Sequence, residues 1–287
     1  MAHPGQVPVY GCAWHPDRAT AVRCVRCGRP VCPECMRSAP VGQQCVECVQ
    51  QGAKSVRTVK PLRQARAWIT WALIAVNVLV YAATVSDGTD GDLMSSQLFR
   101  ELVLYLPWVA QGEFWRTITT GFLHLSLMHI AVNMLSLAMI GPGLERAFGG
   151  QRYVAIYGTA LLGSSAAAMW FTPNTLVAGA SGAIYGLLGA ALVLSLRERL
   201  NPQTIIVVLV LNIGLSISLP GISLAGHMGG LAFGVLSAGA LLYYREVCRW
   251  VGMPELIRKP ATPWALAAAA TALSVALIAA KVITFTA

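Results

Sequence analysis

The sequence has few charged residues: only 11% of its 287 residues are Asp, Glu, Lys or Arg, against about a quarter in a typical soluble domain. Apolar residues make up 56% of the chain. These proportions exclude an ordinary soluble enzyme and a disordered chain. The apolar runs also lack the alternation of apolar and polar residues that marks strands, which argues against a sheet-rich fold. The composition predicts an all-α polytopic membrane protein.

Seven apolar runs each approach the ~20 residues that a helix needs to cross a bilayer. We expect membrane-spanning helices over residues 67–85, 117–140, 153–171, 178–196, 203–219, 222–244 and 262–280. The loop of residues 86–116 contains a shorter apolar piece, residues 102–110. This piece is too short to cross, so we expect it to lie in the membrane interface or to re-enter partway.

The Lys and Arg residues are distributed unevenly between the two sides of these spans. With the N-terminus in the cytoplasm, 18 of the 21 lie in cytoplasmic segments, and only Arg100, Arg116 and Lys281 lie on the outer side. This asymmetry follows the positive-inside rule. We therefore expect a multi-pass protein of a bacterial plasma membrane, without a cleavable signal peptide, whose C-terminus is outside. The net charge of +9 then reflects topology rather than affinity for nucleic acid.

Cysteine is nearly absent from the apolar part of the chain. Seven of the eight cysteines lie between residues 12 and 48, and the eighth, Cys248, is expected to be a passive thiol. Pairs with two-residue spacers offer eight ligands: Cys12 and His15, Cys24 and Cys27, Cys32 and Cys35, Cys45 and Cys48. A tetrahedral structural zinc takes four such ligands, so residues 1–50 are predicted to bind two zinc ions and to fold through them. The spacing disfavours a disulfide scaffold or an iron–sulfur cluster.

The four pairs resemble the B-box type of zinc finger, in which ligand pairs interleave. That resemblance implies one site from the first and third pairs and another from the second and fourth, although spacing alone does not fix the pairing. We interpret the module as a regulatory or protein-binding element with a cytoplasmic partner. A basic linker, residues 51–66, joins it to the membrane part.

A few polar residues interrupt the apolar runs at a similar depth. His124, His129 and Asn133 lie in the second predicted span, Ser181 begins the fourth, and His227 lies near the start of the sixth. All three spans enter the membrane from the outer side. Histidines inside membrane helices are costly and by default mark a functional site or a water-filled cavity. We therefore expect these residues to meet in one site near the outer leaflet.

Small residues follow Ser181 and His227 at helical spacing. The two stripes are Gly182, Gly186 and Ala190 in the fourth span and Gly226, Gly230 and Gly234 in the sixth. Such stripes let two helices pack closely, which would bring the Ser181 hydroxyl to the His227 imidazole as a nucleophile–base pair. No carboxylate lies in the predicted spans to complete a triad. Tyr185, one turn after Ser181, is expected to stack on the His227 ring.

The second predicted span adds candidates for an oxyanion site. His129 and Asn133 are four residues apart and share one face of a helix. On the same helix His124 would lie about 140° away from His129. We therefore expect His124 to brace the entrance of the span rather than to face the reaction.

At these residues the chain resembles the rhomboid family of intramembrane serine proteases. The resemblance covers roughly residues 68–245. It rests on Trp115-Arg116, His124-x4-His129-x3-Asn133, Gly141-x3-Glu145-Arg146, Gly179-Ala180-Ser181-Gly182 with Tyr185, and Ala225-Gly226-His227-x2-Gly230. It implies a six-helix protease core, residues 67–245. We expect a cytoplasmic connector and a seventh helix over residues 246–287, which lie outside the resemblance.

The resemblance also implies roles for single residues. Ser181 would be the nucleophile and His227 the general base, without any cofactor for catalysis. The Ser181 N–H, His129 and Asn133 would line the oxyanion site, next to Gly179.

The predicted activity is hydrolysis of peptide bonds in single-span transmembrane substrates near the outer leaflet. Two other functions stay open on the sequence. A transporter also uses intramembrane histidines, although the chain has no convincing internal repeat to support one. A catalytically silent adaptor would recruit partners through the zinc module and ignore serine-directed probes. A membrane metalloprotease is disfavoured because no His-Glu-x2-His motif is present.

Overall fold

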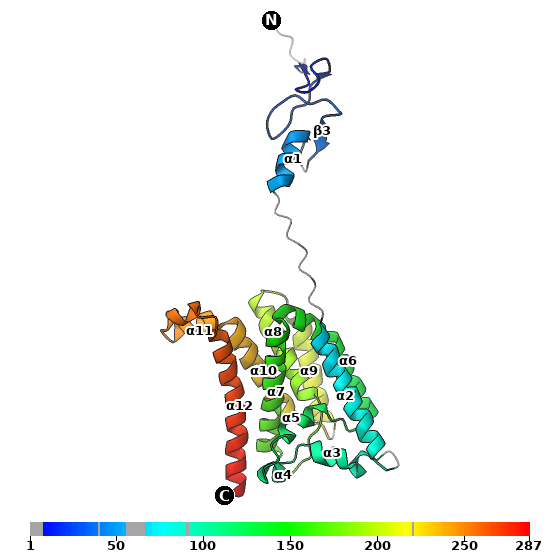
Figure 1. Cartoon of the computed structure of the whole chain (residues 1–287), viewed down its shortest axis with the longest axis vertical. Coiled ribbons are helices and arrows are strands. Elements are labelled where there is room, and N and C mark those ends of the chain that lie inside the picture. Colours follow the sequence, from blue (N-terminus) through cyan, green and yellow to red (C-terminus); the bar gives the residue numbers. More distant parts are fainter. Residues whose placement is uncertain (1–7, 40, 56–66, 90–91, 220) are drawn as a thin grey trace. The chain divides into compact units, whose positions relative to one another are not determined.

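The structure is a computed structural model that describes residues 8–39, 41–55, 67–89, 92–219 and 221–287. The chain divides into two compact units, Met1–Arg63 (blue in Figure 1) and Gln64–Ala287. Most of the predicted linker, namely residues 56–66, lies outside the described residues. The two units are built on different principles.

The first unit consists of two short antiparallel strand pairs and one helix. Strand β1 (Tyr10–Gly11) pairs with β2 (Ala19–Thr20), and β3 (Met36–Ser38) pairs with β4 (Gln43–Cys45), directly before α1 (Val46–Ser55). The buried apolar cluster of its described residues consists of six cysteines and Val31. A core with so little aliphatic surface cannot supply the folding free energy alone.

The second unit is a helical bundle. Its long helices are α2 (Trp68–Asp87), α6 (Leu127–Phe148), α7 (Gly150–Phe171), α8 (Ser181–Arg197), α9 (Gln203–Ser218), α10 (Leu224–Leu242) and α12 (Thr262–Thr286). Five of these, in the part of the chain that the structure describes, are long and apolar enough to cross a membrane. The other two, α8 and α9, are equally apolar but have 17 and 16 residues. The predicted all-α multi-pass membrane fold is confirmed.

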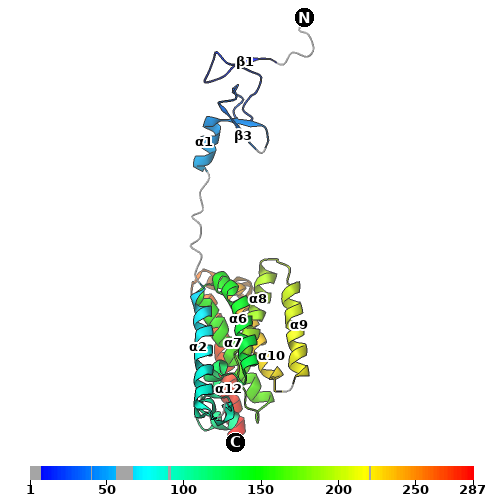
Figure 2. The ribbon, with the colours of Figure 1, turned by 90° about the vertical axis from the view of Figure 1, so that its right-hand side faces the viewer.

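Helix α7 lies at the centre of the bundle. It packs against α8, α10 and α12, and α8 in turn packs against α10. Helix α2 packs against α6, whereas α9 lies at the edge beside α8 (Figure 2). The chain between α10 and α12 forms a short helix, α11 (Tyr244–Trp250), and a 3-10 turn, η3 (Pro254–Arg258). Helix α12 therefore returns along α7 and α10 and adds a seventh helix to the six.

The predicted second span, residues 117–140, is wrong in its bounds. Residues 116–122 instead form a short helix, α5 (Arg116–Thr119), and a 3-10 turn, η2 (Thr120–Phe122). Helix α6 begins only at Leu127, because the Ser126 Oγ accepts a hydrogen bond from the His129 N–H and caps the first turn. His124 therefore precedes the helix, and the angle predicted between His124 and His129 does not apply.

Helix α6 extends past the predicted span to Phe148, and its later end brings a carboxylate into the bundle. Glu145 is only 3% exposed. Its carboxylate accepts hydrogen bonds from the Ile69 N–H at 3.0 Å, the Thr70 N–H at 2.8 Å and the Thr70 hydroxyl at 2.7 Å. These donors belong to the first turn of α2, whose N–H groups have no partner within the helix. Glu145 thus caps α2 and ties it to α6.

The loop between α2 and α6 is folded around a buried arginine. It contains a 3-10 turn, η1 (Leu93–Ser95), and the helices α3 (Gln97–Leu102) and α4 (Leu106–Ala110). Arg116 donates hydrogen bonds to the carbonyls of Arg100 and Val103 and pairs with Glu113. The apolar piece, residues 102–110, packs through Leu106 and Val109 against residues of α7 and α12. This anchors the loop to the bundle.

Helices α8 and α10 meet backbone against backbone. A Cβ atom added to Gly230 would lie 2.0 Å from the carbonyl oxygen of Gly182, and one added to Gly234 would lie 2.2 Å from that of Gly186. Real Cβ atoms essentially never approach so closely, so a side chain at either position would force the two helices to shift. The small-residue stripes predicted from the sequence therefore face each other.

We predict that Glu145→Ala destabilises the bundle by about 2–4 kcal/mol, because the first turn of α2 loses a charged acceptor inside an apolar environment. The measurement is the free energy of unfolding of the full chain in detergent. The exposed neighbour provides a control: Arg146→Ala should change it by less than about 0.5 kcal/mol. Equal losses in both variants would contradict the capping role.

We predict that Gly230→Ala costs about 1–3 kcal/mol of unfolding free energy, since the added methyl group forces α8 and α10 apart. Gly239→Ala on the same helix is the matched control, because a Cβ atom there meets nothing within 4 Å. The same unfolding measurement applies. Similar stability for the two variants would show that close packing of these helices is dispensable.

Candidate active site and metal-ligand clusters

Ser181 and His227 meet at the N-terminal ends of α8 and α10. Ser181 is the first residue of α8, and His227 lies in the first turn of α10, whose N-terminus is capped by Ser223. The His227 Nε2 and the Ser181 Oγ are 2.7 Å apart, a hydrogen-bond distance. His227 is only 8% exposed, whereas Ser181 is partly exposed. A hydroxyl hydrogen-bonded to an imidazole is the arrangement of a nucleophile and its base.

Two side chains hold the His227 ring from other sides. The Tyr185 ring stacks on it with a centroid distance of 4.1 Å and an interplanar angle of 15°. The Ser216 Oγ of α9 lies 2.8 Å from the His227 Nδ1. Both nitrogens of the imidazole therefore have a hydroxyl partner.

Sequence reasoning missed Ser216. A signal was available, because Asn212 and Ser216 form a polar pair four residues apart in an otherwise apolar span. The same spacing singled out His129 and Asn133.

His129 approaches the nucleophile through Gly179. The backbone at Gly179 has a φ of +137°, and an added Cβ atom would lie 2.9 Å from the His129 Nε2 and 3.4 Å from the Ser181 Oγ. The His129 Nδ1 accepts a hydrogen bond from the Leu125 N–H at 3.4 Å. Its proton therefore resides on Nε2, which faces the nucleophile as a donor.

Asn133 and His124 both contact His129. The Asn133 Nδ2 donates a hydrogen bond of 2.8 Å to the His129 carbonyl, which leaves its second hydrogen available. His124 is fully buried, and the edge of its ring packs against His129 at a centroid distance of 5.0 Å. His124 thus supports the His129 ring.

The first unit gathers its cysteines and His15 into two groups. One group is Cys12, His15, Cys32 and Cys35, and the other is Cys24, Cys27, Cys45 and Cys48. Within each group the ligand atoms all lie within 4.8 Å of one another. The membership is the interleaved one implied by the resemblance to a B-box.

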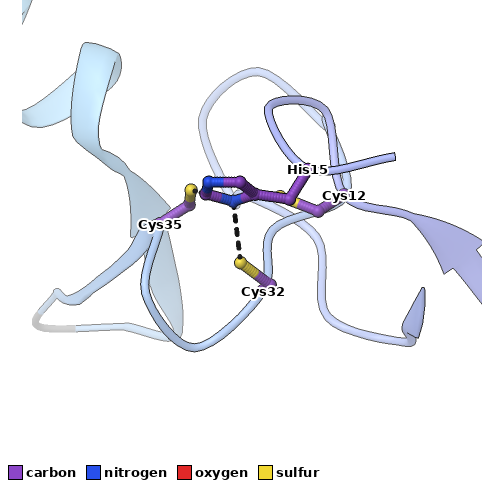
Figure 3. Close-up of side chains that lie close together, drawn as sticks. All are labelled: Cys12, His15, Cys32 and Cys35. Atoms are coloured by element: carbon purple, nitrogen blue, oxygen red, sulfur yellow. Dashed lines mark hydrogen bonds between the residues drawn. The ribbon is translucent and has the colours of Figure 1, made fainter. Parts of the chain in front are cut away.

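The spacing of these atoms suits a tetrahedral metal ion. Zinc–sulfur bonds of about 2.3 Å place two thiolates about 3.8 Å apart in a tetrahedron, and the Cys27 and Cys45 sulfurs are 3.8 Å apart. In the other group the His15 ring points its Nδ1 at the cysteines (Figure 3), 3.4 Å from the Cys32 sulfur and 3.3 Å from the Cys35 sulfur. Both groups can therefore hold a metal ion.

The cysteine thiols of these groups differ in their pKa values. Burial opposes ionisation of Cys12 and Cys24, but hydrogen bonds from backbone N–H groups outweigh it and lower the pKa of each to about 6. Burial raises the pKa of Cys35 to about 11. Each group thus presents a ready thiolate, the form that a metal binds.

Known proteins are similar in sequence to this chain. Residues 111–244 match the Rhomboid domain. Rhomboid protease GluP of Bacillus subtilis is 40% identical over 177 residues, which cover 60% of this chain and 34% of that protein. RHOMBOID-like protein 4 of Arabidopsis thaliana is 33% identical over 226 residues, 66% of this chain and 57% of that protein.

A further relative is covered more completely. Putative rhomboid protease YdcA of Bacillus subtilis is 30% identical over 179 residues, which cover 60% of this chain and 81% of that protein. By contrast, the chain spans only 34% of the first relative and 57% of the second. Given these similarities and its apolar helices, the chain is an integral multi-pass membrane protein that belongs to the rhomboid family.

Proposed function

We propose that the chain is an intramembrane serine endopeptidase that hydrolyses peptide bonds of transmembrane proteins. The hydrogen bond of 2.7 Å between the Ser181 Oγ and the His227 Nε2 carries this proposal. Membership of the rhomboid family supports it, as do the names of two relatives from Bacillus subtilis, both called rhomboid proteases. No metal or cofactor has a part in the proposed reaction.

The reaction begins with attack of the Ser181 Oγ on the scissile carbonyl carbon, while the His227 Nε2 takes the hydroxyl proton. The tetrahedral intermediate collapses as the carbon–nitrogen bond breaks, and His227 gives its proton to the leaving amine. Water then attacks the acyl-enzyme, with His227 again as base, and releases the second product and the free serine.

The negative oxygen of the intermediate would lie beside Gly179. Donors for it are the N–H of Ser181 at the positive end of α8, the His129 Nε2–H and the second hydrogen on the Asn133 Nδ2. Because Gly179 has no side chain, a substrate carbonyl can approach between His129 and Ser181. His124 would fix the His129 ring, and Tyr185 the His227 ring.

The substrates in this proposal are single-span membrane proteins, cut near the outer leaflet. The Lys and Arg distribution supports a cytoplasmic N-terminus and an outer C-terminus in a bacterial plasma membrane. With that orientation Ser181 lies at the outer end of its helix. A substrate would reach it from the bilayer after its own helix unwinds locally.

For the first unit we propose two structural zinc ions, one in each cysteine group. They would supply the folding free energy that a core of six cysteines and Val31 lacks. The unit would then serve as a cytoplasmic protein-binding or regulatory module. Catalysis in the bundle would not depend on the ions.

We predict that Ser181→Ala lowers cleavage of a single-span substrate in vesicles by about 10³-fold or more, because the nucleophile is lost. Labelling by a fluorophosphonate should disappear as well. Ser195→Ala is the matched control, since this buried serine lies on the same helix, about 21 Å from Ser181 along its axis. Cleavage that persists in Ser181→Ala would overturn the proposed activity and favour a transporter or an adaptor.

We predict two zinc ions per chain, measured by elemental analysis of the purified protein. Cys12→Ser and Cys24→Ser should each remove one ion, because each breaks a different four-ligand group. Cys248→Ser is the control and should retain both ions.

A strong chelator should make residues 8–55 sensitive to protease while the bundle keeps its thermal unfolding temperature. Retention of protease resistance after complete metal removal would show that the unit folds without zinc.

A further inference from the structure

Ser216 stands out as a buried polar residue on α9, a helix at the edge of the bundle (Figure 2). Among the residues of α9, only Leu209 and Ser216 are buried, and Ser216 is 6% exposed. Most of the large side chains of α9, such as Val210 and Leu211, are exposed and apolar. A buried hydroxyl in such a helix needs hydrogen-bond partners, because water is not available to it.

The Ser216 Oγ has three partners at hydrogen-bond distance. They are the Asn212 carbonyl at 2.8 Å, the His227 Nδ1 at 2.8 Å and the Tyr185 hydroxyl at 3.1 Å. A hydroxyl offers one hydrogen and two lone pairs. The carbonyl can only accept, so the single hydrogen of Ser216 goes to Asn212. The two lone pairs must then accept from His227 and Tyr185.

This arrangement determines where the imidazole carries its proton. An acceptor at Nδ1 requires the hydrogen of neutral His227 to reside on Nδ1, which leaves a lone pair on Nε2. That lone pair faces the Ser181 hydroxyl at 2.7 Å. Only this tautomer can take the serine proton. After it does so, the Nδ1–H of the imidazolium still has its acceptor.

Ordinary helix packing does not explain these contacts. Serines in membrane helices often donate to the carbonyl four residues earlier and act only as packing residues. Ser218 on the same helix does this, with a hydrogen bond of 2.8 Å to the Gly214 carbonyl. Ser218 is exposed and has no other hydrogen bond within the described residues. Ser216 forms the same local bond but adds two partners at the candidate active site.

We propose that Ser216 is a positioning residue that keeps His227 in the Nδ1–H tautomer and in line with Ser181. The inference rests on the proposed protease function. In this proposal the Ser181–His227 pair has a third hydrogen-bonded member, the neutral hydroxyl of Ser216 on α9. Tyr185 stacks on the His227 ring and also donates a hydrogen bond to the Ser216 hydroxyl. Tyr185 and Ser216 together therefore restrict both the tilt and the rotation of the His227 ring.

The test compares Ser216→Ala, Ser216→Thr and Ser218→Ala in the full-length protein in vesicles, with a single-span substrate. Loss of the carboxylate partner in a serine-protease triad costs about 10⁴-fold in kcat, and a neutral hydroxyl contributes less. We expect Ser216→Ala to lower kcat by about 10–100-fold with KM changed by less than about two-fold. Ser216→Thr should recover most of kcat because it restores the acceptor. Ser218→Ala should match the wild type.

A second measurement reads the tautomer directly. In protein labelled with 15N-histidine, the His227 signals, assigned by their loss in His227→Asn, should report a protonated Nδ1. In Ser216→Ala they should report a mixture of the two tautomers. Thermal unfolding in detergent should be the same for both proteins.

Wild-type kcat or an unchanged tautomer in Ser216→Ala would overturn the proposal. So would a loss of kcat that Ser216→Thr does not restore while the Thr variant still shows a protonated Nδ1. The parent function is tested separately by Ser181→Ala. If that variant is inactive and Ser216→Ala is fully active, only the role of Ser216 is wrong, whereas cleavage by Ser181→Ala removes the protease itself.

Discussion

The contact between α8 and α10 is the constraint on which the candidate site depends. Gly182 and Gly186 face Gly230 and Gly234 so closely that no side chain fits between the two backbones. A serine and a histidine have short side chains, so their hydroxyl and imidazole meet only when their helices touch. The glycines set that separation in the first turns of α8 and the second and third turns of α10. The 2.7 Å distance between the Ser181 Oγ and the His227 Nε2 follows from it at the N-terminal ends of the two helices.

Buried polar groups hold the remaining elements around this pair. Glu145 caps α2 against α6, and Arg116 binds two carbonyls of the preceding loop. Ser216 links α9 to His227 and Tyr185. Each group has partners because an unpaired polar group in an apolar bundle is costly. The hydrogen bonds that offset this desolvation cost also fix the positions of the helices. The same interactions therefore determine both the stability of the bundle and the geometry of the candidate site.

Different interactions stabilise the two units. The bundle buries large apolar surfaces and gives several of the polar groups inside it hydrogen-bond partners. The first unit has almost no aliphatic core among its described residues, and six cysteines of its two four-residue groups are buried. A metal ion would replace a hydrophobic core there. This difference explains why cysteine is concentrated in one part of the sequence and glycine stripes in the other.

The sequence by itself determined the features that composition and spacing encode: an all-α membrane fold, eight candidate metal ligands in pairs, and small-residue stripes beside Ser181 and His227. Ligand spacing and glycine periodicity are local, so they can be read along the chain. Two features were decided only by the tertiary structure: Glu145 lies within the bundle, and Ser216, whose pairing with Asn212 the sequence shows, lies against His227. The start of α6 at its Ser126 cap is a local feature that hydropathy does not show. When a helix is apolar on all sides, its sequence pattern does not show which face points into the bundle. Packing against neighbouring helices then determines the rotation of the helix about its axis.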